Sequence, residues 1–267
     1  MLFSVIVTAL NAGEKLKETV DSVRMQSFRD YEIVVQDGGS KDGSAEFLAA
    51  APYAEDDRIR MFTESDTGIY DGMNKAIDKI RGRYVLFLNC GDLLYDDSVL
   101  ARTAEAIAAK GTPGNAIFYG DVFERKSGQV VPANPKLDDF ALFRNLPCHQ
   151  ACFYAADLFS ERKYDLSYRV RADYEHFLWC CYVKGAATVP LGFTSASYEG
   201  GGFSETVRGR SISAREHREI TQKYMPRGKV LTYRALMILT LQPLREKLAS
   251  DRRTAQVYDK IKKLMYK

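Results

Sequence analysis

Three runs of apolar, largely β-branched residues near the N-terminus constrain the fold most strongly. They cover residues 3–10, 31–36 and 84–88, and helical patterns with polar turns separate them. Continuous apolar runs of this length are typical of strands buried on both faces. Strands that alternate with helices through short connections predict βαβ units and a mainly parallel sheet, which is an α/β fold. Such sheets bind their ligands beyond the carboxyl ends of the strands.

The rest of the chain continues this alternation. Leu16, Val20 and Val23 recur at helical spacing, and Asn11 with Glu14 resembles a capping pair in front of them. Gly82 is expected to end a second helix, whose apolar face begins near residue 69. Further helices are expected over 44–51, 97–110 and 173–183, and further strands over 58–63, 116–123, 149–155 and 187–191.

Charge divides the chain into two parts. Residues 205–267 hold sixteen Lys and Arg against six Asp and Glu, whereas residues 1–204 carry a net charge of −7. A length of 267 residues suits one large α/β domain with an appendage. An acidic body with a basic, partly apolar tail therefore indicates two separate roles, and the tail suits an anionic surface or partner.

Several classes of protein are disfavoured. The five cysteines are odd in number and lack zinc-ribbon spacing, which argues against a disulfide framework and for a reducing compartment. The chain lacks a signal peptide, and its apolar runs are shorter than the ~20 residues that span a bilayer. No Gly-x-Gly-x-x-Gly follows the first strand, which disfavours a nicotinamide or flavin enzyme.

The first polar loop of interest follows the second apolar run. Asp37 opens the segment D-G-G-S-K-D-G-S, which also contains Asp42. A carboxylate at a strand end can accept hydrogen bonds from a base N–H group or a ribose hydroxyl. The alternative is that both acids only shape a tight turn.

A second polar segment precedes the helix near residue 69. Asp71, Asn74 and Lys75 stand at i, i+3 and i+4, so they share one helix face. The free N–H groups at the start of such a helix can bind an anion. The alternative is a surface salt bridge between Asp71 and Lys75.

A third segment, N-C-G-D, follows the most apolar run of the chain. Its only acid is Asp92. A carboxylate at this edge of the sheet suits Mg²⁺ or Mn²⁺ bridging two phosphates, and the metal would stabilise a departing diphosphate. One carboxylate is an incomplete set of ligands, so phosphate and water must supply the others. The alternative is an N-cap for the next helix.

These segments together resemble family-2 glycosyltransferases of the GT-A fold. The resemblance is carried by V-I-V-T-A-L-N, V-V-Q-D-G-G-S-K-D-G-S, D-T-G-I-Y-D-G-M-N-K-A-I and L-F-L-N-C-G-D, in that order over residues 3–92. It is closest to the branch that builds bacterial O-antigen and capsular or exopolysaccharide. It implies a Rossmann-like GT-A domain over 1–205, with a nucleotide-binding half (1–95) and an acceptor half (96–205), and leaves a helical extension over 206–267.

The resemblance also implies the residues of the donor site. Asp92 would hold Mn²⁺ or Mg²⁺, although Asn89 stands where the family usually has a first Asp. Asp37 would contact the base, which is usually uracil. The other donor-binding positions would be Thr8, Leu10, Asn11, Gly68, Asp71, Asn74, Lys75, Asn89, Cys90, Gly91 and Ser204.

On the acceptor side, the resemblance implies Asp173 as the general base that deprotonates the attacking hydroxyl. One such displacement inverts the anomeric configuration. Glu175 is the competing base, and it would point roughly 200° away around the helix. Asp173 could instead only complement the helix dipole. His149 and Gln150 are expected near the acceptor.

The basic tail and the resemblance together indicate the partners. Relatives use lipid-diphosphate-linked acceptors, so an amphipathic helix over 212–267 would attach a cytoplasmic enzyme to the inner face of the membrane. The alternatives are a helical cap and a homodimer interface. Nucleic acid is not an expected partner, because the body is acidic and no nucleic-acid module is present.

The expected function is therefore inverting transfer of a hexose or N-acetylhexosamine from a UDP-linked donor to a saccharide acceptor. A homologue that binds nucleotide-sugar without turnover remains an alternative, because of Asn89. A sugar-nucleotide pyrophosphorylase is a second alternative, but its Gly-rich N-terminal signature is absent.

Overall fold

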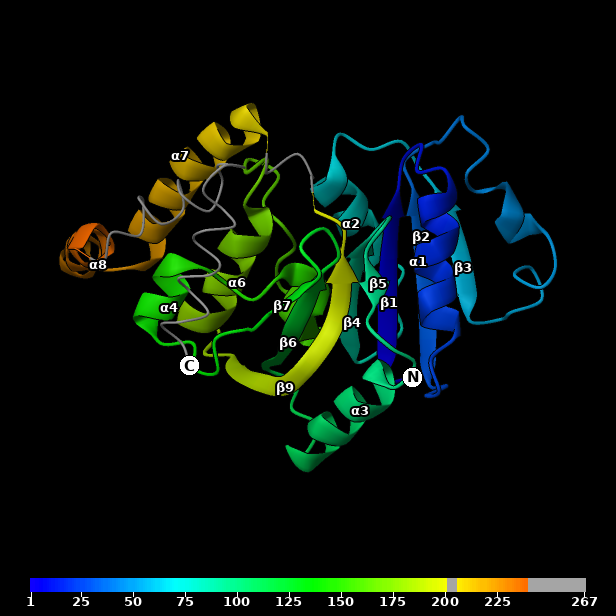
Figure 1. Cartoon of the computed structure of the whole chain (residues 1–267), viewed down its shortest axis with the longest axis horizontal. Coiled ribbons are helices and arrows are strands. Elements are labelled where there is room, and N and C mark those ends of the chain that lie inside the picture. Colours follow the sequence, from blue (N-terminus) through cyan, green and yellow to red (C-terminus); the bar gives the residue numbers. More distant parts are fainter. Residues whose placement is uncertain (201–205, 240–267) are drawn as a thin grey trace. The chain divides into compact units, whose positions relative to one another are not determined.

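A computed structural model describes residues 1–200 and 206–239 of the chain. The chain divides into two compact units, Met1–Arg218 and Glu219–Lys267. The first unit contains a mixed sheet with helices packed against it (Figure 1). Within the described part of the chain the sheet has nine strands, in the order β3-β2-β1-β4-β8-β6-β9-β5, with β7 paired to β6.

Seven of the nine described strands overlap the predicted ranges, whereas β5 and β7 were not predicted. Their bounds are β1 (Phe3–Ala9), β2 (Tyr31–Asp37), β3 (Ile59–Thr63), β4 (Tyr84–Asn89), β5 (Leu93–Leu94), β6 (Ala116–Glu124), β7 (Gln129–Val131), β8 (Cys152–Ala155) and β9 (Ala187–Tyr198). The first four strands pair in parallel, and β6 with β9 forms a further parallel pair. The pairs of β8 with β4 and β6 are antiparallel. The expected α/β class and mainly parallel sheet are confirmed.

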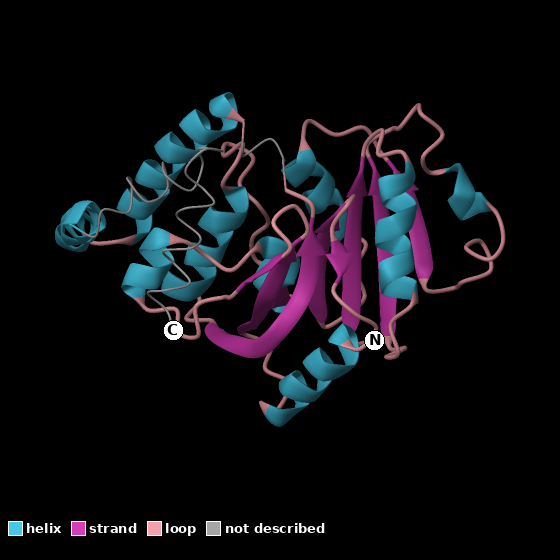
Figure 2. Cartoon of the chain, in the orientation of Figure 1, coloured by secondary structure: helices cyan, strands magenta, loops and turns pink. Residues whose placement is uncertain are grey.

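The helices connect and flank these strands (Figure 2). Their bounds in the first unit are α1 (Glu14–Arg24), η1 (Glu46–Ala49), α2 (Ile69–Ile77), α3 (Val99–Ala109), α4 (Asp139–Arg144), η2 (His149–Ala151), α5 (Asp157–Ser160) and α6 (Ala172–Tyr182). The last two helices are α7 (Val207–Tyr224) and α8 (Arg227–Leu239). Helix α1 packs on β1 and β5, and α2 packs on β1 and β2.

The core lies on and between the parallel strands. All seven residues of β2 are buried, and β1 and β4 are nearly as buried. Each large apolar side chain in such a position stabilises the fold by about 1.5–3 kcal/mol relative to exposure. Aromatic rings extend the core from β4 through β8 to α5, where Phe87, Tyr154 and Phe159 meet in edge-to-face pairs. This packing fixes the strand ends that carry the polar segments.

Two predicted details at the N-terminal half are wrong. Asn11 and Glu14 do not cap α1, because the N-cap is Gly13 and no side chain caps it. Asn11 adopts a left-handed conformation (φ 49°) and bonds to another loop instead. The helix expected over 44–51 is only the short 3₁₀ turn η1, since the residue before Pro52 is disfavoured in a helix.

Three further boundaries differ. Helix α2 ends at Ile77, and Gly82 serves a close approach, because a Cβ there would lie 2.4 Å from the Phe3 backbone. Residues His149–Ala151 form the turn η2 before β8 rather than strand. Strand β9 runs on to Tyr198, because register shifts between Tyr119 and Val122 let it keep pairing with β6 (Figure 1).

Two other expectations concern the described residues. All five cysteines are free thiols in the structure. Across residues 1–200 and 206–239, no helix is long and apolar enough to cross a membrane. In the second unit, α8 buries Val230 and exposes Leu231, Ile238 and Leu239.

Candidate active site

The carboxyl ends of β1, β2 and β4 bring three polar segments together. The parallel register sets Ala9 beside Asp37 and Thr8 beside Asn89. The loops that follow these strands therefore leave the sheet at one edge, as the sequence predicted from the βαβ pattern. Most of the predicted donor residues lie on these loops or on the first turns of α2.

The loops after β1 and β2 are bound to each other. The backbone N–H of Asn11 donates to Ser40 Oγ (2.8 Å), and the side-chain Oδ1 of Asn11 accepts from the backbone N–H of Lys41 (2.9 Å). The Gly13 N–H donates to Asp42 (3.0 Å). Hydrogen bonds, chiefly from Ser44, lower the pKa of Asp42. Asp42 therefore braces the loops, while the neighbouring Leu10 side chain is exposed.

Asp37 shapes the turn that it opens. Its carboxylate is 2% exposed and accepts from the N–H groups of Gly39 (3.2 Å) and Ser40 (3.1 Å), and from the Ser40 hydroxyl. The turn-forming alternative is thus observed. Both oxygens of the Asp37 carboxylate take part in this turn, since each accepts from Ser40 and Oδ2 also accepts from Gly39.

Side chains link the end of β4 to β1 and to the acceptor half. Thr8 Oγ1 donates to Asn89 Oδ1 (2.8 Å), and the Cys90 thiol donates to the Thr8 carbonyl (3.1 Å). On its other side, Asn89 Nδ2 lies 3.2 Å from His149 Nε2. Asn89, which replaces the family's usual acid, therefore connects the first strand with the turn η2.

Asp92 lies half-buried beside this group. It does not cap the following helix, because the N-cap of α3 is Ser98. Its Oδ2 accepts weakly from the Asn89 N–H (3.3 Å). Burial raises the pKa of Asp92, while the charges of His149 and Arg125 lower it. Because Asp92 accepts only this weak hydrogen bond in the described structure, its carboxylate oxygens have lone pairs available to coordinate a cation.

The residues near Asp92 could supply part of a metal site. No cluster of three His, Cys, Asp or Glu side chains that could hold a metal occurs in the described ranges. Asn89 contacts Asp92 Oδ2 through its backbone N–H (3.3 Å) and His149 Nε2 through its side chain (3.2 Å), so one carboxylate and one imidazole lie around it. The protein thus offers two of the donors that a divalent cation needs, and a diphosphate and water would complete the set. The residues fit a metal that arrives with its ligand.

The polar face of α2 mostly braces its own loop. Asp71 accepts from the Thr67 N–H (2.9 Å) and pairs with Lys75 (3.2 Å), which is the salt-bridge alternative. Lys75 also donates to the Ser65 carbonyl (2.6 Å). Gly68, at φ 148°, lets the chain turn into the helix. These contacts hold the first turn of α2 against the loop that precedes it.

Asn74, predicted to face the donor, forms hydrogen bonds with a residue far along the chain. Its Nδ2 donates to the Tyr164 carbonyl and its Oδ1 accepts from the Tyr164 N–H, both at 2.9 Å. The side-chain amide is therefore matched to backbone groups far away in the sequence.

Asp173 and Glu175 occupy different environments on α6. Asp173 is half-buried, caps nothing, and accepts a hydrogen bond from the Tyr70 hydroxyl (2.9 Å). Glu175 is fully buried and pairs with Arg162 (2.8 Å). Breaking such a buried pair costs about 3–5 kcal/mol, so Glu175 has a clear structural role. Of the two acids, only Asp173 retains exposed surface.

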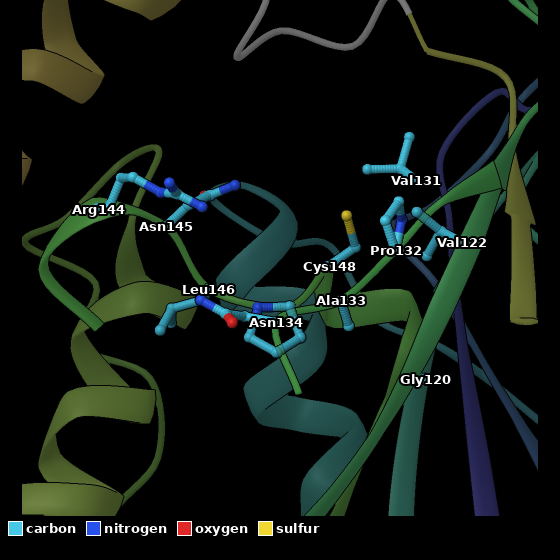
Figure 3. A pocket seen from close by; sticks show the side chains of 11 residues that line it. Gly120, Val122, Val131, Pro132, Ala133, Asn134, Arg144, Asn145, Leu146 and Cys148 are labelled. Carbon is cyan, nitrogen blue, oxygen red and sulfur yellow. The ribbon is translucent and has the colours of Figure 1, made fainter. Parts of the chain in front are cut away.

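A small pocket is lined in part by Cys148, the residue before His149 (Figure 3). Its volume of about 90 Å³ admits several waters or one part of a larger ligand. Figure 3 shows Cys148 between Arg144 on one side and Val131 with Pro132 on the other. The lining residues come from β6, the segment after it and the chain before η2: Gly120, Val122, Val131, Pro132, Ala133, Asn134, Arg144, Asn145, Leu146, Pro147 and Cys148. Gln150, also predicted near the acceptor, is buried.

Sequence reasoning missed two residues of this site. Arg125, just after β6, donates to the Gly91 carbonyl, and its Nη1 is buried without a hydrogen-bond partner in the described structure. Tyr70 contacts Asp173 from α2. An Arg in a turn and a Tyr in a helix carry no local signal, because each acts across more than 30 residues of sequence.

The family match covers the carboxyl ends of β1, β2 and β4 as well as helix α2. Residues 4–159 match the profile of glycosyl transferase family 2. The chain belongs to glycosyl transferase family 2. It is 35% identical over 77% of its length to a PGL/p-HBAD biosynthesis glycosyltransferase of Mycobacterium bovis, and the match covers 80% of that protein. An uncharacterized glycosyltransferase of Mycobacterium tuberculosis is 31% identical over 70% of this chain and 71% of its own length.

Solved structures support the GT-A fold. S. aureus TarS 1–349 in complex with UDP-GlcNAc matches with a TM-score of 0.65 at 16% identity, covering 87% of this chain and 69% of TarS 1–349. In a second structure of S. aureus TarS 1–349, the match covers 60% of that chain. The mannosyltransferase PcManGT of Pyrobaculum calidifontis, in complex with GDP-Man and Mn²⁺, has a TM-score of 0.64 at 14% identity, with 99% and 80% coverage.

Proposed function

We propose that this glycosyltransferase moves a hexose or N-acetylhexosamine from a UDP-linked donor to a saccharide acceptor with inversion at C1. One observation carries the proposal. The Tyr70 hydroxyl, on the first turn of α2, lies 2.9 Å from Asp173 Oδ1. The carboxylate proposed as the base therefore lies beside the helix turn that is proposed to face the sugar and diphosphate.

The donor would lie across the carboxyl ends of β1, β2 and β4. Asp37 would meet the base, and Thr8 with the 10–11 segment would line the nucleoside. Gly68 and the first turn of α2 would face the sugar and diphosphate, beside the Asn89–Cys90–Gly91 turn. The TarS and PcManGT complexes with nucleotide-sugars support a donor of this class. Ser204, predicted to bind phosphate, lies outside the described residues.

Asp92, with His149 beside it, would hold Mn²⁺ or Mg²⁺. A divalent cation bound there supplies Lewis-acid stabilisation of the departing diphosphate. Arg125 adds a fixed positive charge next to the Gly91 carbonyl. Its unpartnered Nη1 is suited to a phosphate oxygen, because guanidinium groups bind phosphate in charge-assisted hydrogen bonds.

Asp173 would act as the general base. Its carboxylate takes the proton of the acceptor hydroxyl while that oxygen bonds to C1 of the sugar. The bond between C1 and the diphosphate oxygen breaks, and its electron pair leaves with the nucleoside diphosphate. Attack from the face opposite the leaving group inverts C1. Glu175 is not our choice for this role, since it is buried against Arg162.

The acceptor would enter beside the pocket lined by Cys148 and Arg144. Within the described structure Arg144 has no ion-pair or hydrogen-bond partner, and it is exposed. A cation beside the apolar walls of Val131 and Leu146 suits an acceptor that joins an anionic group to a less polar one. A lipid-diphosphate-linked saccharide has this chemistry, and the exposed apolar residues of α8 suit attachment to the inner membrane face.

The function is tested by following UDP release from UDP-glucose, UDP-galactose and UDP-N-acetylglucosamine with Mn²⁺, with water as the acceptor. We expect turnover of at least one donor. Asp173→Asn should lower it by about 10²-fold or more, as loss of a general base does. Asp92→Ala should lower it when metal is present.

The outcomes separate the alternatives. Binding of nucleotide-sugar without turnover by the wild-type chain would favour an inactive homologue. Release of diphosphate from sugar-1-phosphate and UTP would favour a pyrophosphorylase. Full activity of Asp173→Asn would place the base elsewhere, and full metal-dependent activity of Asp92→Ala would refute the metal assignment.

A further inference from the structure

Among the residues that the structure describes, Tyr70 alone donates a side-chain hydrogen bond to Asp173. It stands on the second position of α2, 103 residues before Asp173 in the sequence. Its hydroxyl lies 2.9 Å from Asp173 Oδ1 and 2.8 Å from the Val170 carbonyl. Tyr70 thus joins the helix that borders the donor to the start of α6.

The hydroxyl is held as a proton donor. Burial and the nearby Asp173 charge raise the pKa of Tyr70 well above that of a free tyrosine. The phenol therefore stays neutral at any pH at which the enzyme works. Its single proton can point to the Asp173 carboxylate or to the Val170 carbonyl, so Tyr70 keeps a partner when Asp173 gains a proton.

The two ends of this contact are rigid. On α2, Asn74 is fixed to the Tyr164 backbone, and the Tyr70 ring packs on the Tyr164 ring at 5.4 Å. At the start of α6, the buried Glu216 carboxylate accepts from the N–H groups of residues 169–171 (2.8–3.0 Å). A short hydrogen bond between two fixed backbones sets the direction of the Asp173 carboxylate.

We propose that Tyr70 is a positioning residue for the transfer reaction: its hydroxyl orients Asp173 toward the acceptor hydroxyl and ties that orientation to α2. The proposal rests on the role of Asp173 in the proposed function. A donor bound against the first turn of α2 would restrict the motion of this helix. The same helix carries Tyr70, which orients Asp173. A base displaced from hydrogen-bond reach loses efficiency steeply, because proton transfer needs close geometry.

The test compares Tyr70→Phe with wild type in UDP release from the fastest of the three UDP-sugars. We expect kcat to fall by about tenfold and donor KM to change less than about twofold, since only the base is misdirected. Tyr164→Phe is the matched control. The Tyr164 hydroxyl lies in the same aromatic group and is buried without a hydrogen-bond partner in the described structure. Its removal should leave kcat near wild type.

A second comparison separates positioning from general support. In single turnovers with enzyme in excess, Tyr70→Phe should cost nothing further in an Asp173→Asn background, because its effect passes through that carboxylate. An equal cost in both backgrounds, an equal loss in Tyr164→Phe, or a loss confined to donor KM would overturn the proposal. If Asp173→Asn itself retains activity, the assignment of the base fails instead.

Discussion

The side-chain amide of Asn74 forms two hydrogen bonds of 2.9 Å with the backbone N–H and carbonyl of Tyr164. This pair connects α2, on the donor half, with the segment that leads into α6. Asn74 therefore has a structural role. Its side-chain amide provides one donor and one acceptor, and these pair with the Tyr164 carbonyl and the Tyr164 N–H.

The first prediction concerns this pair. Asn74→Ala should lower the free energy of unfolding by roughly 1–3 kcal/mol, because two backbone groups of Tyr164 lose their partner. Urea denaturation measures the change. Asn74→Asp should also destabilise, since a carboxylate cannot donate to the Tyr164 carbonyl. UDP affinity at low temperature should stay close to wild type in both variants. A selective loss of UDP binding with unchanged stability would instead give Asn74 a donor-binding role.

The second prediction concerns Arg125. Arg125→Ala should weaken binding of UDP by about tenfold, as expected when one charge-assisted hydrogen bond to phosphate is lost. Uridine, which has no phosphate, should bind both proteins equally, and isothermal titration measures the two affinities. Arg125→Lys should recover only part of the difference, because an ammonium group cannot bond to Gly91 and phosphate in the same fixed geometry. Equal loss for uridine and UDP would contradict this role.

The third prediction concerns pH and His176. This side chain stacks on Phe159 at 4.3 Å, and burial lowers its pKa to about 4 from 6.5. Below pH 6.5 the unfolded chain binds a proton that the folded chain does not, so stability falls as pH decreases toward 4. The loss reaches about 3 kcal/mol at most.

His176→Gln serves as the comparison, because glutamine can still bond to the Arg162 carbonyl that His176 contacts (3.0 Å). Its unfolding free energy, measured by denaturant titration at several pH values, should decline less than that of wild type between pH 6.5 and 4. The two proteins would show parallel declines if His176 were protonated freely in the folded state.

The fourth prediction concerns the exposed apolar residues of α8. Leu231→Asp combined with Ile238→Asp should reduce sedimentation of the full chain with phosphatidylglycerol vesicles, since both side chains are about two-thirds exposed (66% and 68%). Val183→Asp, which alters a similarly exposed apolar residue (61%) of the first unit, is the control. Phosphatidylcholine vesicles should retain less of the wild type. Absence of binding to either vesicle, with a dimer seen by light scattering, would favour a homodimer interface.

Much of the donor edge could be predicted from sequence because its signals are local. An apolar run followed by a turn and an acid identifies a strand end, and parallel strands collect their ends at one edge. Asp37, Asn89 and Asp92 lie there for that reason. The prediction that Asn11 caps α1 relied on a short-range pattern alone, and it was wrong. The Asn11 side chain accepts a hydrogen bond from the Lys41 N–H and does not cap α1.

The α/β class, the order of the polar strand ends and the family could all be recognised in the sequence, because each depends on residues that are close together along the chain. What each polar group contacts could be seen only in the folded chain. Asn74 meets the Tyr164 backbone, Glu175 meets Arg162, and Asp173 meets Tyr70. These partners lie on different elements, and their pairing depends on how the helices pack, because a buried polar group takes whichever partner the packed core brings within hydrogen-bond reach.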